Sequence, residues 1–194
     1  HRRPALVADG GRVPQHHRGE LASPGGQPGV LAAEVRALRL VAAVQAEVMS
    51  GLLPQFECGR LRQKPVVVRN PATGEVVYLA PDAQDVSGLM EELVTWVKDQ
   101  KGKVDALIVA GVCHKQMVVI HPFMDGNGRT TRLITKVLLA QMGVDTFNLF
   151  SFENYYNQNV TKYFQTVGEF GDYYELKDRI DFTNWLEYFT EGII

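Results

Sequence analysis

One short segment of this chain combines residue types that could perform chemistry on phosphate groups. Residues 121–132 read His-Pro-Phe-Met-Asp-Gly-Asn-Gly-Arg-Thr-Thr-Arg. A glycine-bearing loop that opens into a helix offers free backbone N–H groups and the positive end of the helix dipole to an anion. Gly126 and Gly128 have no side chain, so phosphate oxygens could approach the main chain there. The segment therefore predicts a phosphate-binding loop.

Charged residues of both signs accompany this loop. Arg129 and Arg132 are three residues apart, so both guanidinium groups can lie on one helix face. Two cations suit a polyphosphate, and the alternative is that each arginine pairs with an acid of a neighbouring helix. Asp125 beside phosphates is explained by a shared Mg²⁺, or otherwise by a role as a turn or helix-capping residue.

The segment begins with a candidate base. The imidazole of His121, with an unperturbed pKa of about 6.5, could accept a proton from an attacking hydroxyl, although a histidine taken alone is more often a packed or capping residue. We expect Phe123 to anchor the loop in the core. Asn127 could tolerate an unusual backbone geometry or offer its amide to a phosphate.

Helices must hold this loop in place. Residues 104–120 are apolar nearly all round, which predicts a central buried helix, and residues 130–142 predict an amphipathic helix after the loop. Residues 65–79 place two valine-rich runs around an Asn-Pro-Ala-Thr-Gly turn, which predicts a β-hairpin. Further helices are expected over residues 30–51, 86–97, 151–167 and 181–189. The fold class is therefore mostly α.

Composition limits the classes of protein to which the chain can belong. Its 194 residues suit one domain, expected over residues 30–194, after an irregular extension over residues 1–29. The net charge of −2 argues against a direct nucleic-acid partner. Cys58 and Cys113 form no CxxC pattern, so a disulfide framework is not indicated and a reducing cytoplasm is expected. No apolar run approaches the ~18 residues of a membrane span.

The eight specified positions of H-P-F-x-x-G-N-G-R-x-x-R would match by chance at on the order of 10⁻¹⁰ per starting site. This segment resembles the signature of the Fic family, and the resemblance covers roughly residues 30–194. It implies a Fic/Doc-like helical bundle with a small β-hairpin flap. It also implies transfer of AMP from ATP to a Ser, Thr or Tyr hydroxyl of a target protein, with release of pyrophosphate.

The resemblance assigns roles to the residues of the signature. His121 would be the general base and Asp125 the Mg²⁺ ligand. Arg129 and Arg132 would bind the β- and γ-phosphates. The phosphate cradle would comprise Gly126, Asn127 and Gly128. The residues of the flap that could dock an extended target segment would be Val66, Val67 and Val68.

A tyrosine-rich segment further along also resembles the family, in the part that helps to enclose adenine. We take Tyr156 and Asn159 from it as nucleotide contacts. The family often has arginine directly after this asparagine, whereas this chain has Val160. The nucleotide pocket is therefore expected to differ from that of the family at this position. Phe164 is expected in the core, since aromatic residues at helical spacing usually are.

The sequence does not decide how the expected activity is regulated, and it leaves functions other than AMP transfer open. Many relatives carry an inhibitory helix with the pattern [S/T]xxxE[G/N], and no stretch of this sequence matches it. Inhibition could come from a separate antitoxin-like protein, from a helix outside this sequence, or not exist. The alternatives to AMP transfer are a non-catalytic nucleotide-binding module and a kinase-like phosphotransferase. The sequence leaves self-association into a homo-oligomer open.

Overall fold

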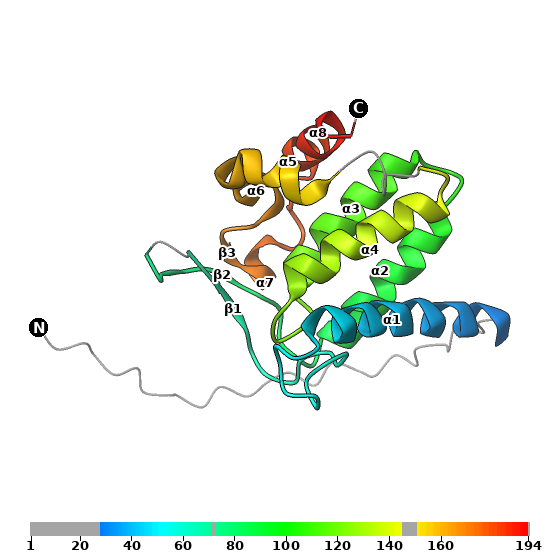
Figure 1. Ribbon diagram of the computed structural model, residues 1–194, viewed down its shortest axis with the longest axis horizontal. Coiled ribbons are helices and arrows are strands. Elements are labelled where there is room, and N and C mark those ends of the chain that lie inside the picture. Colours follow the sequence, from blue (N-terminus) through cyan, green and yellow to red (C-terminus); the bar gives the residue numbers. More distant parts are fainter. Residues whose placement is uncertain (1–27, 71–72, 145–150, 194) are drawn as a thin grey trace, which may run out of the picture.

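The computed structural model describes residues 28–70, 73–144 and 151–193, so nearly all of the expected N-terminal extension lies outside the described residues. The described part is mostly helical, as predicted, with a small sheet beside a helical bundle (Figure 1). In chain order its elements are α1 (Pro28–Met49), β1 (Val67–Arg69), β2 (Val76–Leu79), α2 (Val86–Gln100), α3 (Ala106–Ile120), α4 (Asn127–Gln141), α5 (Phe152–Gln158), α6 (Val160–Val167), β3 (Gly171–Asp172), α7 (Tyr173–Leu176) and α8 (Thr183–Glu191).

Helix α3 lies at the centre because it is apolar on every side. It packs against α2, α4 and α8, and most of its side chains are buried. Gly111 allows α8 to come close, because a Cβ there would lie 2.7 Å from the Cδ2 atom of Leu186. The indole Nε1 of Trp185 donates to the carbonyl of Gly111 at 2.7 Å. The predicted central helix is thus confirmed, and its last residue adjoins the signature loop.

Most element boundaries lie within three residues of the expected ones, and two differences bear on the candidate site. Helix α4 starts at Asn127, three residues before the expected start, so the Gly-Arg part of the signature belongs to its first turn. The helix expected over residues 151–167 is two helices, α5 and α6, which meet at Asn159. Asn159 has φ −146° and ψ 75°, and its side chain accepts a bond from the N–H of Lys162 at 2.9 Å. A local cap therefore interrupts the helix that periodicity alone predicts.

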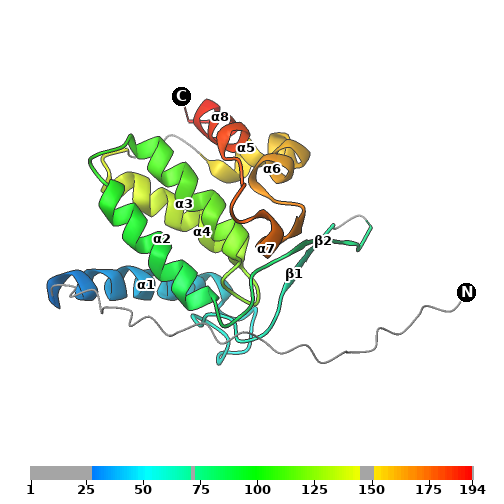
Figure 2. The ribbon, with the colours of Figure 1, turned by 180° about the vertical axis from the view of Figure 1, so that it is seen from behind.

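The predicted hairpin is present and carries a short third strand. Strands β1 and β2 are antiparallel, with Val67 opposite Leu79, and β3 pairs in parallel with β2, so β1 lies at the edge. The Tyr78 hydroxyl donates to the carbonyl of Val119 at 3.0 Å, which ties β2 to α3. The hairpin projects from the bundle beside the start of α4, as both ribbon views show (Figure 2).

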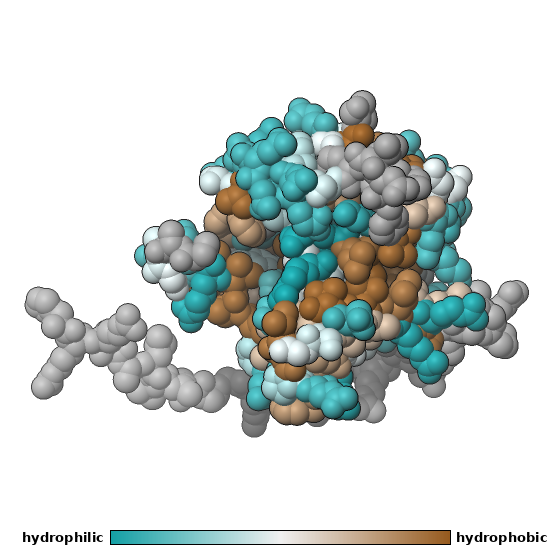
Figure 3. All heavy atoms as spheres, viewed as in Figure 1, coloured by the Kyte–Doolittle hydropathy of each residue, from teal (hydrophilic) through white to brown (hydrophobic). Residues whose placement is uncertain are grey.

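Helix α1 crosses the bundle against α2 and α4. On the face drawn in Figure 3, hydrophobic residues gather over α4 and the adjoining part of α1. Val35 and Leu40 of α1 are exposed, so the described residues cover its apolar stripe only in part. Among the described helices, none has both the length and the hydropathy that crossing a membrane requires.

Candidate active site

His121 lies at the C-terminal end of α3 in a left-handed backbone conformation, with φ 52° and ψ 60°. In the part of the chain that the structure describes, it is the one non-glycine residue with positive φ. Its N–H still bonds the carbonyl of Met117 at 3.1 Å. Such a conformation costs about 1–3 kcal/mol and persists only where surrounding contacts hold it. Its position at this turn is therefore held by tertiary contacts.

The imidazole of His121 is prepared to accept a proton. Its Nδ1 lies 3.3 Å from the carbonyl oxygen of Val118, which accepts a bond only from an Nδ1–H group. In that tautomer Nε2 is a free acceptor. Burial lowers the pKa of His121, against the opposing effect of the bond to Val118. The ring is therefore neutral at pH 7, which is the state that a general base requires.

The loop after His121 is closed by Asn127. Its Oδ1 accepts from the N–H of Phe123 at 2.9 Å, and its Nδ2 donates to the carbonyl of Phe123 at 2.9 Å. Phe123 is fully buried, which confirms it as the loop anchor. The side-chain amide of Asn127 thus closes the loop, which is neither of the two roles considered for it, and binding of phosphate by this residue stays a prediction.

Gly126 is required by the shape of the loop. Its φ of 79° favours glycine, and a Cβ there would collide with the sulfur of Met49 on α1. Gln45, one turn earlier on α1, donates to the carbonyl of Asp125 at 3.2 Å and accepts from the N–H of Gly59 at 2.5 Å. Sequence reasoning missed Gln45, although a glutamine on an apolar helix face was a signal. Helix α1 therefore supports the loop from below.

The start of α4 forms the candidate phosphate cradle. The first N–H groups of a helix have no acceptor within it, and Gly126 provides no side-chain cap there. Gly128 and Arg129 are exposed, so this helix end faces solvent. A Cβ atom added at Gly128 would lie 3.4 Å from a terminal nitrogen of Arg132. The guanidinium of Arg132 therefore lies alongside the cradle. The arrangement suits an anion with several charges.

Arg132 already has a partner within the chain. Its Nε lies 3.4 Å from Oε1 of Glu153 on α5, and Oε2 of Glu153 lies 3.4 Å from Nζ of Lys136. Burial alone would raise the Glu153 pKa, but a backbone hydrogen bond and the two cations hold it below its usual range. The pairing that was the alternative reading of the arginines therefore occurs at Arg132. Sequence reasoning did not single out Glu153.

Asp125 is an exposed carboxylate beside the cradle. Its Oδ1 accepts from the N–H of Gly126 at 2.6 Å, which fits the turn role considered for it, whereas Gly126 and not Asp125 is the N-cap residue of α4. Among the described residues, no group of three or more His, Cys, Asp or Glu side chains could hold a metal alone. One carboxylate combined with nucleotide phosphates is nevertheless a donor set that Mg²⁺ accepts. The residues present therefore fit Mg²⁺ only together with a phosphate ligand.

Of the two residues expected as nucleotide contacts, Tyr156 is buried and Asn159 is exposed. The Tyr156 ring is buried with 3% exposure and stacks on Tyr163 with a centroid distance of 4.2 Å. Asn159 is exposed and caps α6. The expectation for Phe164 is wrong, because its side chain is 55% exposed. In this conformation Tyr156 is a core residue, since solvent does not reach its ring.

The flap valines lie on the edge strand. Val66 directly precedes β1, Val67 is 38% exposed, and Val68 packs on the small cluster around Tyr78. Within the described residues, β1 pairs on one side only, with β2. An edge strand of this kind can pair with an extended peptide.

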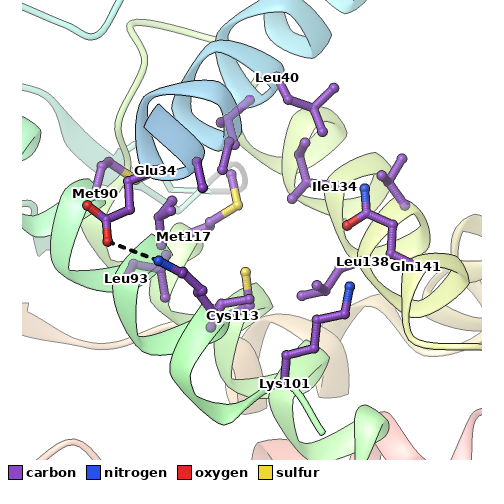
Figure 4. A pocket seen from close by; sticks show the side chains of 17 residues that line it. Glu34, Leu40, Met90, Leu93, Lys101, Cys113, Met117, Ile134, Leu138 and Gln141 are labelled. Atoms are coloured by element: carbon purple, nitrogen blue, oxygen red, sulfur yellow. Dashed lines mark ion pairs between the residues drawn. The ribbon is translucent and has the colours of Figure 1, made fainter. Parts of the chain in front are cut away.

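An apolar cavity of about 220 Å³ lies elsewhere, between α1, α2, α3 and α4 (Figure 4). Met90, Cys113, Met117 and Leu138 are among its lining residues, and none of the lining residues belongs to the 121–132 segment. The chemistry-bearing loop is thus an exposed helix end and not part of this cavity.

Comparison with known proteins decides the family. A family model described as Fic/DOC family matches residues 37–139, which is more than half of the chain and includes the whole signature. The chain belongs to the Fic/DOC family. As a Fic/DOC protein it carries the signature loop between α3 and α4, while α5 to α8 lie beyond the matched range.

Curated relatives of this Fic/DOC chain include protein adenylyltransferase fic-1 of Caenorhabditis elegans, 32% identical over 88 residues, and protein adenylyltransferase Fic of Drosophila mojavensis, 32% identical over 94 residues. These matches cover 45% and 48% of this chain but 16% and 17% of the relatives. The chain therefore spans less than a fifth of the length of the curated relatives it matches.

Solved structures share the Fic/DOC fold. A Fic family protein from Desulfovibrio desulfuricans superposes with a TM-score of 0.58 at 22% identity, covering 87% of this chain and 52% of that one. The Bartonella tribocorum protein BepC, solved with bound AMPPNP, has a TM-score of 0.50 at 14% identity and covers 84% of each chain. At these identities the likeness shows the fold alone, and the fold expected from the resemblance is confirmed.

Proposed function

We propose that this chain is a protein adenylyltransferase that transfers AMP from ATP to a Ser, Thr or Tyr hydroxyl of a target protein. The observation that carries the proposal is the neutral His121, whose Nδ1–H group faces Val118 and whose Nε2 is free, at the beginning of the loop that leads into the α4 cradle. The relatives named protein adenylyltransferase support this reading. The AMPPNP bound to BepC supports an ATP-type substrate.

In the proposed reaction, Nε2 of His121 accepts the proton of the target hydroxyl. The hydroxyl oxygen forms a bond to the α-phosphorus of ATP, and the bond from that phosphorus to the β-phosphate bridging oxygen breaks, which releases pyrophosphate. The α4 N-terminus, Arg129 and Arg132 bind the phosphates and stabilise the charge that develops on the leaving group. Asp125 would hold Mg²⁺ together with those phosphates, and the ion would supply further charge neutralisation.

The target protein would dock on the hairpin. An extended target segment can add to the free edge of β1, where Val67 is exposed, and main-chain bonds to the strand would align it with the site. Main-chain bonds to the strand are largely independent of which side chains the target carries. Specificity would therefore come from the side chains of the target that flank the accepting hydroxyl.

A labelling experiment tests this function. The chain is incubated with a cell lysate, MgCl₂ and ATP labelled at either the α- or the γ-phosphate, in parallel with the His121→Ala variant. Label from the α-phosphate alone, absent with the variant, is the expected result. Label from the γ-phosphate alone would instead indicate phosphate transfer. Binding of AMPPNP without protein labelling from either position would contradict an enzymatic function and favour a nucleotide-binding module.

A further inference from the structure

Arg62 is a buried cation outside the signature. It lies between α1 and β1, and 1% of its surface is exposed. Within the described residues no carboxylate forms an ion pair with it, and burial lowers its pKa against the opposing charge of Asp82. A buried guanidinium is costly unless its donors are satisfied. The partners that satisfy them therefore indicate what Arg62 does.

Among the described residues, the hydrogen-bond partners of this guanidinium are backbone carbonyls from two parts of the fold. Its Nε donates to the carbonyl of His121 at 2.8 Å, and one terminal nitrogen also lies 3.4 Å from the carbonyl of Ile120. The same terminal nitrogen donates to the carbonyl of Pro81 at 2.5 Å. The second terminal nitrogen donates to the carbonyl of Lys64 at 3.2 Å. One group thus joins the end of α3 to both ends of the hairpin.

These bonds act where the backbone most needs support. The last carbonyls of a helix lack partners and carry partial negative charge, so a cation there is favourable. The Arg62 N–H also donates to the carbonyl of Pro122 at 2.9 Å, so Arg62 holds His121 from both sides of its left-handed turn. A guanidinium presents its donors in a rigid planar fork, whereas a lysine ammonium is a single point.

We propose that Arg62 is a positioning residue, which fixes His121 relative to the β1–β2 hairpin so that a hydroxyl docked on the hairpin meets the imidazole. This inference rests on the proposed function. Lys64 precedes β1 and Pro81 follows β2, so a shift of either hairpin leg is transmitted to the carbonyl of His121. The bonds of Arg62 reach residues 64, 81 and 120–122 and not the cradle at the start of α4.

The test compares Arg62→Lys, which keeps the charge but loses the fork, with Arg60→Lys, which alters an exposed arginine of the same segment. Transfer of label from α-labelled ATP to lysate proteins is measured at varied ATP concentration. Arg62→Lys is expected to lower kcat on the order of 10²-fold, since displacement of a catalytic group by about 1 Å has this effect, with KM for ATP unchanged. Arg60→Lys should behave as the native chain does.

Two further measurements separate this inference from the proposed function. The imidazole NMR signals of His121, assigned by their loss in His121→Ala, should shift in Arg62→Lys. Hydrogen exchange over the hairpin residues 64–70 and 73–81 should rise in the same variant. Both readouts need no activity. If the native chain transfers no label, the proposed function fails, while these two readouts still decide whether Arg62 couples hairpin and histidine.

Native kcat in Arg62→Lys, or a loss of stability with unchanged His121 signals and hairpin exchange, would overturn the proposal. If Arg62→Lys does not fold, insertion of one glycine between Gln63 and Lys64 replaces it, because this leaves the bonds to His121 and displaces one hairpin leg. That insertion should lower kcat with KM for ATP unchanged, and native kcat would again overturn the proposal.

Discussion

Glu153 lies on α5 with its Oε1 atom 3.4 Å from Nε of Arg132, the second arginine of the signature. Both side chains keep part of their surface in solvent, at 23% for Arg132 and 49% for Glu153. Lys136 joins the pair from one turn further along α4. In the proposed reaction Arg132 binds phosphate, so Glu153 competes with the nucleotide for the same guanidinium.

Glu153→Gln should therefore tighten nucleotide binding. A half-exposed pair of this kind contributes up to about 1 kcal/mol, which corresponds to about 2- to 5-fold in Kd. Calorimetric titration with AMPPNP and Mg²⁺ measures the change. The matched control is Glu191→Gln, because Glu191 on α8 is also an exposed carboxylate and pairs with Lys162 on α6. This variant should leave the Kd for AMPPNP unchanged. Equal Kd values for Glu153→Gln and the native chain would contradict the competition.

His121→Ala should lose transfer and keep nucleotide binding. A positioned base contributes about 10²–10⁴ in rate, and His121 precedes the cradle without forming it. His121→Asn is the companion variant, because asparagine tolerates the left-handed backbone better than alanine does. Labelling rate and AMPPNP affinity are measured for both. Full activity of His121→Asn would exclude the imidazole as the base.

The rate of transfer should fall on the acidic side of neutrality. Burial lowers the pKa of His121 below its ordinary 6.5, so the neutral, proton-accepting form is present at pH 7 and is lost as the pH falls through that lowered pKa. The pH dependence of kcat/KM between pH 5 and 8 checks this. An acidic limb centred above pH 7 would disagree with a buried neutral imidazole.

The two glycines of the loop should respond differently to alanine. Gly126→Ala introduces a left-handed alanine and a collision with Met49, so we expect it to lower the free energy of unfolding by at least about 2 kcal/mol. Gly128→Ala meets only a terminal nitrogen of Arg132, at 3.4 Å, and should keep stability while weakening AMPPNP binding at the cradle. Urea unfolding and calorimetric titration separate the two effects. Equal stability of both variants would contradict the steric argument.

Acid should destabilise the chain through His114. This side chain is fully buried on α3, with Nδ1 3.0 Å from Oγ1 of Thr135 and Nε2 3.3 Å from the hydroxyl of Tyr163. Burial lowers its pKa to about 3. The unfolded chain takes up a proton below pH 6.5 and the folded chain does not, so stability falls from pH 6.5 towards pH 3. Thermal unfolding of His114→Gln should show a weaker pH dependence than the native chain over this range. An identical dependence would contradict the assignment.

The local elements could be predicted because their signals are contained in neighbouring residues. The apolar run of α3, the valine pairs around the hairpin turn and the glycines of the signature each specify a backbone shape within a few residues. The break at Asn159 and the start of α4 at Asn127 were missed, because a side-chain hydrogen bond to nearby backbone replaces the periodic pattern there.

The sequence by itself determined the family signature, the mostly helical architecture and the order in which a histidine, an aspartate, a glycine-bearing turn and two arginines follow one another. Only the tertiary structure decided what those groups meet. Arg62 reaches the carbonyl of His121 across 59 residues, and Gln45 reaches that of Asp125 across 80. Tyr156 is buried and Phe164 is exposed. The sequence could not predict this difference, because burial depends on how distant helices pack and not on the spacing of residues within one helix.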